Sequence, residues 1–192
     1  MIIPGWVVSI ATFPGVIVHE AAHQYFCKLF KIPVYKVVYF RFGNPAGYVV
    51  HGKTRKYRDI FWISVGPLVI NSLLTIILCF PITAPLWILK CSPLPAIYYV
   101  LFWLGLSIGM NSFPSSGDRE VLWNETKKCF GRSSATKRQT KGGAGILPII
   151  GLPMVVFIYI ANMLSIFWFD LIYAVFIGGM LPRLLIYLAA HL

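Results

Sequence analysis

The chain has 192 residues, of which 58% are hydrophobic and only 12% are charged. Soluble globular domains carry about 25% charged residues, so this composition excludes an ordinary soluble domain and indicates an integral membrane protein. The formal net charge of +11 would suit a nucleic-acid-binding protein, but the basic residues fall in two loops between apolar segments, a pattern that orients membrane proteins. We therefore expect a single membrane-embedded domain over residues 1–192, in contact with the lipid bilayer and with no nucleic-acid partner.

The first apolar segment, residues 6–30, contains the polar motif His19-Glu20-x-x-His23. Residues four apart share one face of a helix, so both imidazoles can reach one metal ion, and the intervening Glu20 can act as a general base toward a metal-activated water. Polar side chains inside a predicted membrane span are energetically costly, and this favours a functional site. The alternative is a chance match in which neighbouring side chains satisfy both histidines.

A basic region and two further apolar segments follow. Residues 34–51 contain two stretches rich in Val, Tyr and Phe around a turn at residues 43–46, which predicts a membrane-associated β-hairpin, with an ordinary surface loop as the alternative. The second and third spans are expected over residues 60–80 and 94–112.

The remainder is a second basic loop, residues 119–145, and an apolar C-terminal region, residues 146–190. A membrane helix needs about 20 residues, so this region predicts two helices with a turn near Asp170, or with a break at Gly178-Gly179 or Pro182. The expected fold is an all-α polytopic membrane protein with about five transmembrane helices. With both basic loops in the cytoplasm, the N-terminus lies outside, the C-terminus lies inside, and the metal motif faces the cytoplasm.

A hydrolytic zinc site typically has three protein ligands and one water. The third ligand must therefore come from another part of the chain. Asp118, which follows a helix break at Pro114, is the best placed of the six acidic residues. His51 and Asp170 are weaker rivals. A solvated carboxylate, or an ion pair with Arg119, is the alternative reading of Asp118.

In their order along the chain, these motifs resemble the site-2 protease family of intramembrane zinc metalloproteases. That family has HExxH on one span and Asn-x-x-Pro followed by Asp on a later span. The matching residues here are His19-Glu20-x-x-His23 and Asn111-x-x-Pro114 with Asp118. The hairpin at 34–51 and Gly66-Pro67 with Asn71 also look similar to features of that family.

The resemblance covers residues 6–118 and implies a three-helix catalytic core within that range. It implies hydrolysis of peptide bonds in membrane-anchored protein substrates, with Zn2+ as the cofactor. The implied roles are metal ligation by His19, His23 and Asp118, general-base catalysis by Glu20, and substrate binding or oxyanion stabilisation by Asn111 and Asn71. No connection is long enough for a PDZ-like or CBS-like domain, so we expect a minimal member.

The main alternative is a non-catalytic metal-binding membrane protein or a transporter. Transporters more often distribute acids and histidines over several spans and contain internal repeats, and the sequence shows neither feature. A glutamate between the two predicted metal ligands favours hydrolysis.

Overall fold

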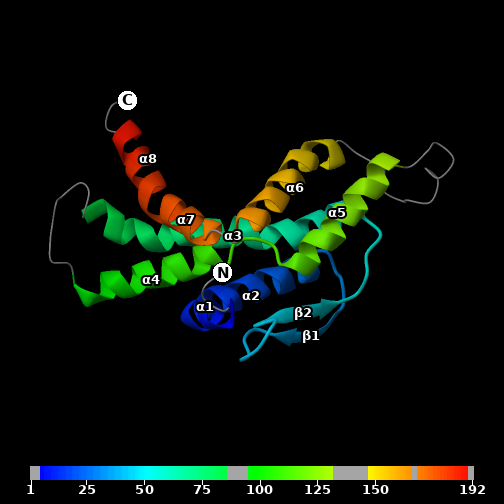
Figure 1. The fold of residues 1–192 in the computed structure, drawn as a ribbon, viewed down its shortest axis with the longest axis horizontal. Helices are drawn as coiled ribbons and strands as arrows, with labels where there is room; N and C mark the ends of the chain where they lie inside the picture. Colours follow the sequence, from blue (N-terminus) through cyan, green and yellow to red (C-terminus); the bar gives the residue numbers. More distant parts are fainter. Residues whose placement is uncertain (1–4, 86–94, 132–146, 166–167, 190–192) are drawn as a thin grey trace.

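The computed structural model describes residues 5–85, 95–131, 147–165 and 168–189, and Figure 1 shows how they are arranged. The chain is mostly helical with one two-stranded sheet, which confirms the coarse fold class. The elements in chain order are α1 (Gly5–Ala11), α2 (Phe13–Leu29), β1 (Val34–Val38), β2 (Tyr48–His51), α3 (Tyr57–Ala84), α4 (Ala96–Met110), α5 (Ser116–Gly131), α6 (Leu147–Leu164), α7 (Phe169–Val175), the π-helix η4 (Phe176–Met180) and α8 (Leu181–Ala189).

Two helical segments are long and apolar enough to cross a membrane, Tyr57–Thr83 in α3 and Phe169–Leu188 in α7–η4–α8. The apolar helices Ala96–Met110 and Gly151–Leu164 are shorter, and α2 has 17 residues. Length and composition therefore support two crossings, and the five-span arrangement stays a prediction.

The first expected span forms two helices instead of one. The break lies at Thr12, and a proline in the first turn of α2 suits a helix start because its missing N–H has no partner there in any case. Gly15 brings α2 against α4: its N–H donates to Ser107 Oγ at 3.0 Å, and a Cβ on Gly15 would lie 2.0 Å from the Ser107 carbonyl oxygen. Only glycine permits this approach, which fixes the start of α2 beside the end of α4.

The predicted hairpin is confirmed. Strands β1 and β2 are antiparallel, with Val38 paired to Tyr48 and Val34 to His51. The hairpin lies beside α2 (Figure 1), and Tyr39 beyond β1 donates from its hydroxyl to Gln24 Oε1 at 2.7 Å. The hairpin therefore lies along the helix that carries the HExxH motif.

The first part of the expected basic loop, residues 119–131, is helical and belongs to α5. This helix packs against α6: Leu122 is fully buried in a cluster with Val155 and Ile158, and Arg119 donates to Asn162 Oδ1. Tertiary contacts with α6 thus stabilise a helix that its polar composition did not predict. The rest of the expected loop, residues 132–145, lies outside the described residues.

The break near Asp170 is confirmed, because α6 ends at Leu164 and α7 begins at Phe169 after Trp168, whose φ is 63°. No break occurs at Gly178-Gly179 or Pro182, where the chain stays helical through η4 and α8.

Helices α6 and α7–α8 follow α3 in the same direction, one after the other. Gly151 in α6 lies against Phe61 near the start of α3, Tyr173 in α7 contacts Ser72 at its middle, and a cavity lined by Ile82 and Leu184 joins its end to α8. The end of α8 therefore lies at the opposite end of α3 from Tyr57. Helix α6 thus reaches only partway along α3 before α7 continues in its direction, and the side of the membrane on which the C-terminus lies stays a prediction.

Candidate metal centre

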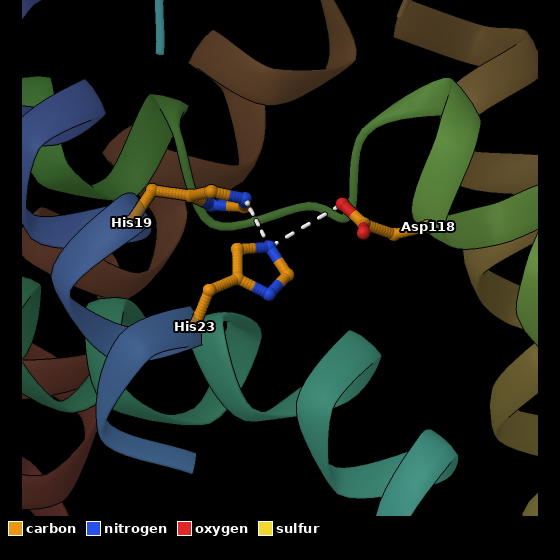
Figure 2. Close-up of side chains that lie close together, drawn as sticks. All are labelled: His19, His23 and Asp118. Carbon is orange, nitrogen blue, oxygen red and sulfur yellow. Dashed lines mark hydrogen bonds and ion pairs between the residues drawn. The ribbon is translucent and has the colours of Figure 1, made fainter. Parts of the chain in front are cut away.

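His19 and His23 lie one turn apart on the buried face of α2, and their rings point toward a common centre (Figure 2). Their Nε2 atoms are 3.1 Å apart, and the two residues are 8% and 5% exposed. Helical periodicity alone brings these two nitrogens together, as the sequence predicts.

Asp118 reaches the histidines from the first turn of α5. Its Oδ2 lies 3.3 Å from His23 Nε2, and the three ligand atoms lie within 4.8 Å of one another. The chain leaves α4 at Met110 and enters α5 at Ser116, so the short connection around Pro114 turns the carboxylate toward α2. The structure thus brings together the three residues predicted as ligands.

Two of the three separations between these atoms fit a metal ion. Ligands about 2.0–2.1 Å from a tetrahedral ion are about 3.3 Å apart, and the observed separations are 3.1 Å between the histidines and 3.3 Å between His23 and Asp118. Two imidazole nitrogens and one carboxylate oxygen form a donor set that zinc accepts. The group could therefore hold a metal ion.

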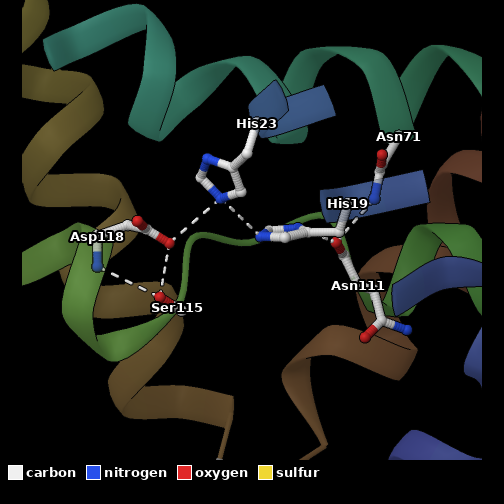
Figure 3. A network of polar contacts seen from close by, with 6 residues as sticks. All are labelled: His19, His23, Asn71, Asn111, Ser115 and Asp118. Carbon is white, nitrogen blue, oxygen red and sulfur yellow. Dashed lines mark hydrogen bonds and ion pairs between the residues drawn. The ribbon is translucent and has the colours of Figure 1, made fainter. Parts of the chain in front are cut away.

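The backbone orients His19. Its Nδ1 donates to the carbonyl oxygen of Asn111 at 2.7 Å, and that same oxygen accepts a bond of 2.8 Å from Nδ2 of Asn71 (Figure 3). A proton on Nδ1 leaves the Nε2 lone pair free for a metal, the arrangement usual for metal-binding histidines. Asn71 thus acts on His19 through one carbonyl group.

The backbone of Ile63 lies beside the ring of His23 and takes the place that the Asn111 carbonyl has for His19. In a regular helix the Ile63 carbonyl would accept the N–H of residue 67, but Pro67 has none. The free carbonyl therefore faces the second ligand instead. Sequence reasoning missed this residue, although the proline four positions later was a usable signal.

Hydrogen bonds keep the carboxylate of Asp118 ionised. Burial alone would raise its pKa, but the hydrogen bond and charge of His23 and the hydrogen bond from Ser115 Oγ outweigh burial, so the pKa lies well below its usual range. The Ser115 bond measures 2.6 Å. A cavity of about 470 Å³ between the β2–α3 connection, α3 and α5 also reaches Asp118. The third ligand is thus charged and accessible.

Glu20 is buried beside His19 but does not belong to the ligand group. Together with His19 it lines a cavity of about 270 Å³ between α2, the hairpin turn and the α6–α7 corner. The hairpin turn fits closely here, because a Cβ on Gly47 would lie 2.7 Å from Glu20 Cγ. A general base must lie beside the metal ligands, next to a space that can hold water and substrate. The position of Glu20 meets both requirements.

The two asparagines take different places. Asn111 lines the Glu20 cavity, although its Nδ2 donates inward to Ser107 O at 2.9 Å and Thr12 Oγ1 at 3.0 Å. Asn71 is fully buried and does not line that cavity, and its Oδ1 has no hydrogen-bond partner within the described part of the chain. A role in substrate binding or oxyanion stabilisation stays a prediction for both residues.

The rival ligands lie elsewhere. His51, at the end of β2, bonds through Nδ1 to the carbonyl oxygen of Gly52 at 2.9 Å. Asp170 accepts a hydrogen bond from Ser165, and both residues line the cavity that Glu20 lines. Neither residue belongs to the ligand group, so the geometry favours Asp118.

No protein-family model, curated protein or solved structure matches this chain. Any functional interpretation of the site therefore depends on the residues and their geometry.

Proposed function

We propose that this protein is a zinc-dependent intramembrane endopeptidase that hydrolyses peptide bonds in or near the transmembrane segments of membrane-anchored proteins. The observation that carries the proposal is the convergence of His19, His23 and Asp118 within 4.8 Å, with Glu20 facing an adjacent cavity. A metal-storage or transport site needs the ligands but has no use for a carboxylate that stands beside them without ligating.

Each residue has a distinct task in this proposal. Bound zinc would activate a water molecule and polarise the scissile carbonyl group. His19 and His23 hold their Nε2 atoms toward the ion because the Asn111 carbonyl and the Ile63 backbone bond to their rings. Glu20 takes a proton from the water and returns it to the leaving amine.

Substrate must reach this site as an extended chain, because a helix hides its peptide bonds in its own hydrogen bonds. The hairpin is suited to receiving such a segment: within the described residues β1 and β2 pair only with each other, so each strand has an edge that can take an added strand. The turn of the hairpin lines the Glu20 cavity, so a captured segment would enter beside the general base.

We infer a multi-pass orientation in the cell membrane with the N-terminus outside and the active site toward the cytoplasm. Because α6 and α7–α8 follow α3 in succession, they account for one passage together, which makes four passages instead of five. A cysteine at Lys53, in a Cys-free background, should react with an impermeant reagent only after cells are opened. A C-terminal tag should react in intact cells, whereas protection of the tag would restore the five-span topology.

The decisive test is to co-express a library of single-span substrates with wild-type protein, Glu20→Gln and the exposed control Glu120→Gln. Fragments should form with wild type and Glu120→Gln and vanish with Glu20→Gln, which should keep its zinc because Glu20 is not a ligand. Undiminished cleavage by Glu20→Gln would contradict the proposal. Absence of any fragment with wild type would favour the non-catalytic alternative.

A further inference from the structure

Another cavity, of about 420 Å³, lies where α2 ends and α3 begins, between the α2–β1 and β2–α3 connections. Phe30, Ile32 and Pro33 give it an apolar side. Four cationic side chains line the rest of this basic pocket: Lys31, Lys53, Arg55 and Lys56.

The positive charge of the basic pocket is not balanced by protein groups. Among the described residues, none of its four cationic side chains has an ion-pair or hydrogen-bond partner. The one carboxylate of the pocket, Asp59, is 4% exposed and already accepts hydrogen bonds from Thr54 and Arg58, each at 3.3 Å. The four cations therefore share a pocket without a counter-charge of their own.

Most other described basic residues do have partners, and Lys28 is the exception. The partners are the Tyr48 ring for Lys36 and Arg41, Asp59 for Arg58, Asn162 for Arg119, the Trp123 ring for Lys127 and Glu125 for Lys128. Within the part of the chain that the structure describes, unpartnered cations thus gather at the basic pocket, whereas a scatter over the surface would suffice to orient the chain in a membrane.

The backbone conformation of Lys31 gives independent evidence that a lysine at this position is functionally constrained. The N–H of Ile32 bonds to the Cys27 carbonyl at 2.8 Å and that of Lys31 to the Lys28 carbonyl at 3.0 Å. These are the two bonds of a Schellman motif, whose left-handed position glycine usually occupies. Lys31 holds that position with φ at 56°. A residue held in an unfavoured conformation points to a functional constraint.

The basic pocket also lies where a membrane surface is expected. The apolar segment of α3 starts at Tyr57, directly after Lys56. At the neighbouring end of α2, Tyr25 and Leu29 are 56% and 53% exposed. Aromatic side chains next to cationic ones are typical of the bilayer interface.

We propose that the basic pocket binds the phosphate group of an anionic phospholipid, with Lys31, Lys53 and Arg55 around the phosphate and Phe30, Ile32 and Pro33 against the glycerol and first acyl carbons. Clustered cations at a cytoplasmic membrane surface attract anionic lipids. A free phosphate ion would use the cations alone, whereas a lipid also covers the apolar side. The assignment does not depend on catalysis.

The test uses full-length protein in neutral detergent and counts bound molecules by native mass spectrometry. The probes are phosphatidylglycerol, phosphatidylcholine and inorganic phosphate at equal concentration. The pocket variant is Lys31→Gln/Lys53→Gln/Arg55→Gln, and the control is Lys36→Gln/Lys127→Gln/Lys128→Gln, which removes the same charge elsewhere. Phosphatidylglycerol should bind wild type and the control equally and the pocket variant at least tenfold more weakly.

Equal loss of phosphatidylglycerol in both triple variants would overturn the pocket, because net charge alone would then explain binding. If phosphatidylcholine binds as tightly as phosphatidylglycerol, the pocket does not recognise an anionic lipid and the proposal is overturned. Full displacement by inorganic phosphate at equal concentration would overturn the lipid as the ligand. Lys31→Gly adds a further check: it should weaken lipid binding and raise the thermal midpoint, since glycine relieves the left-handed backbone.

Discussion

The two halves of α3 have different neighbours. Along residues 57–70 the neighbours are large side chains and polar groups: Phe26 stacks on Trp62 with ring centroids 6.1 Å apart, and the cavities of about 420 and 470 Å³ open beside this half. Along residues 71–84 the neighbours are small. A Cβ on Gly105 would lie 2.4 Å from Cys79 Sγ, and one on Gly178 would lie 2.8 Å from the same atom.

The half at residues 71–84 serves as a packing frame for the helices, whereas the half at residues 57–70 borders the candidate site. Small residues let helices approach closely, which is how membrane helices pack without a strong hydrophobic driving force. Around Cys79 this close approach leaves no room for water or substrate, and the cavity between Ile82 and Leu184 opens only further along this half. The first half instead borders the two cavities of about 420 and 470 Å³, which leave room for water beside it. Asn71 lies at the boundary, with its side chain on the carbonyl that orients His19.

The largest effect should come from Asp118, which links α5 to His23 of α2. Asp118→Asn removes the negative charge of the side chain but keeps its shape. Metal affinity should fall by more than about 100-fold, which exceeds the loss typical of residues that only hydrogen-bond to a metal ligand. Asp170→Asn, on the far side of the Glu20 cavity, should retain the metal. Metal titration of both variants in detergent checks this, and the opposite pattern would make Asp170 the ligand.

A smaller loss is expected at the boundary. Asn71→Ala removes the amide that holds the Asn111 carbonyl, so His19 is less well oriented and metal affinity should fall by about 10–100-fold. The same titration measures this. Unchanged affinity would mean that the carbonyl holds its place without Asn71.

The two prolines inside α3 offer a matched pair, one in each half. Pro67→Ala restores an N–H that competes for the Ile63 carbonyl, so metal affinity should fall by about tenfold while the helix itself becomes more stable. Pro81→Ala should stabilise the helix and leave the metal unaffected. Metal titration together with thermal unfolding separates the two effects, and equal metal affinity in both variants would remove the role assigned to Pro67.

The smallest effect is expected on stability, beside the half of α3 at residues 71–84, where two adjacent glycines can be compared. Gly178→Ala places a methyl group against Cys79 and should lower the free energy of unfolding by about 1–3 kcal/mol. Nothing lies within 4 Å of a Cβ on Gly179, so Gly179→Ala should be neutral or stabilising by up to about 1 kcal/mol. Denaturant unfolding in detergent checks both. Equal destabilisation would indicate a backbone effect common to both glycines.

Local patterns predicted much of this molecule. Helical spacing placed His19 beside His23, turn residues placed the hairpin, and the break at Pro114 placed Asp118. What could not be predicted depends on contacts between distant segments. The length of the apolar region 146–190 shows that it can form two helices, but it does not show how they are oriented. The sequence therefore could not predict that α6 and α7 run in the same direction along α3. The polar face of α5 resembled a loop until its contacts with α6 were known.

The ligands also set an order of events during synthesis. His19 and His23 leave the ribosome long before Asp118, and the hairpin, α3 and α4 lie between them in the chain. On the proposed function, a nascent chain with the two histidines alone has an incomplete ligand set and would hold a metal weakly. Tight metal binding would then become available only after the segments that enclose the site have been made. An immature chain in the membrane would then be inert toward its neighbours, without the need for a separate inhibitory segment.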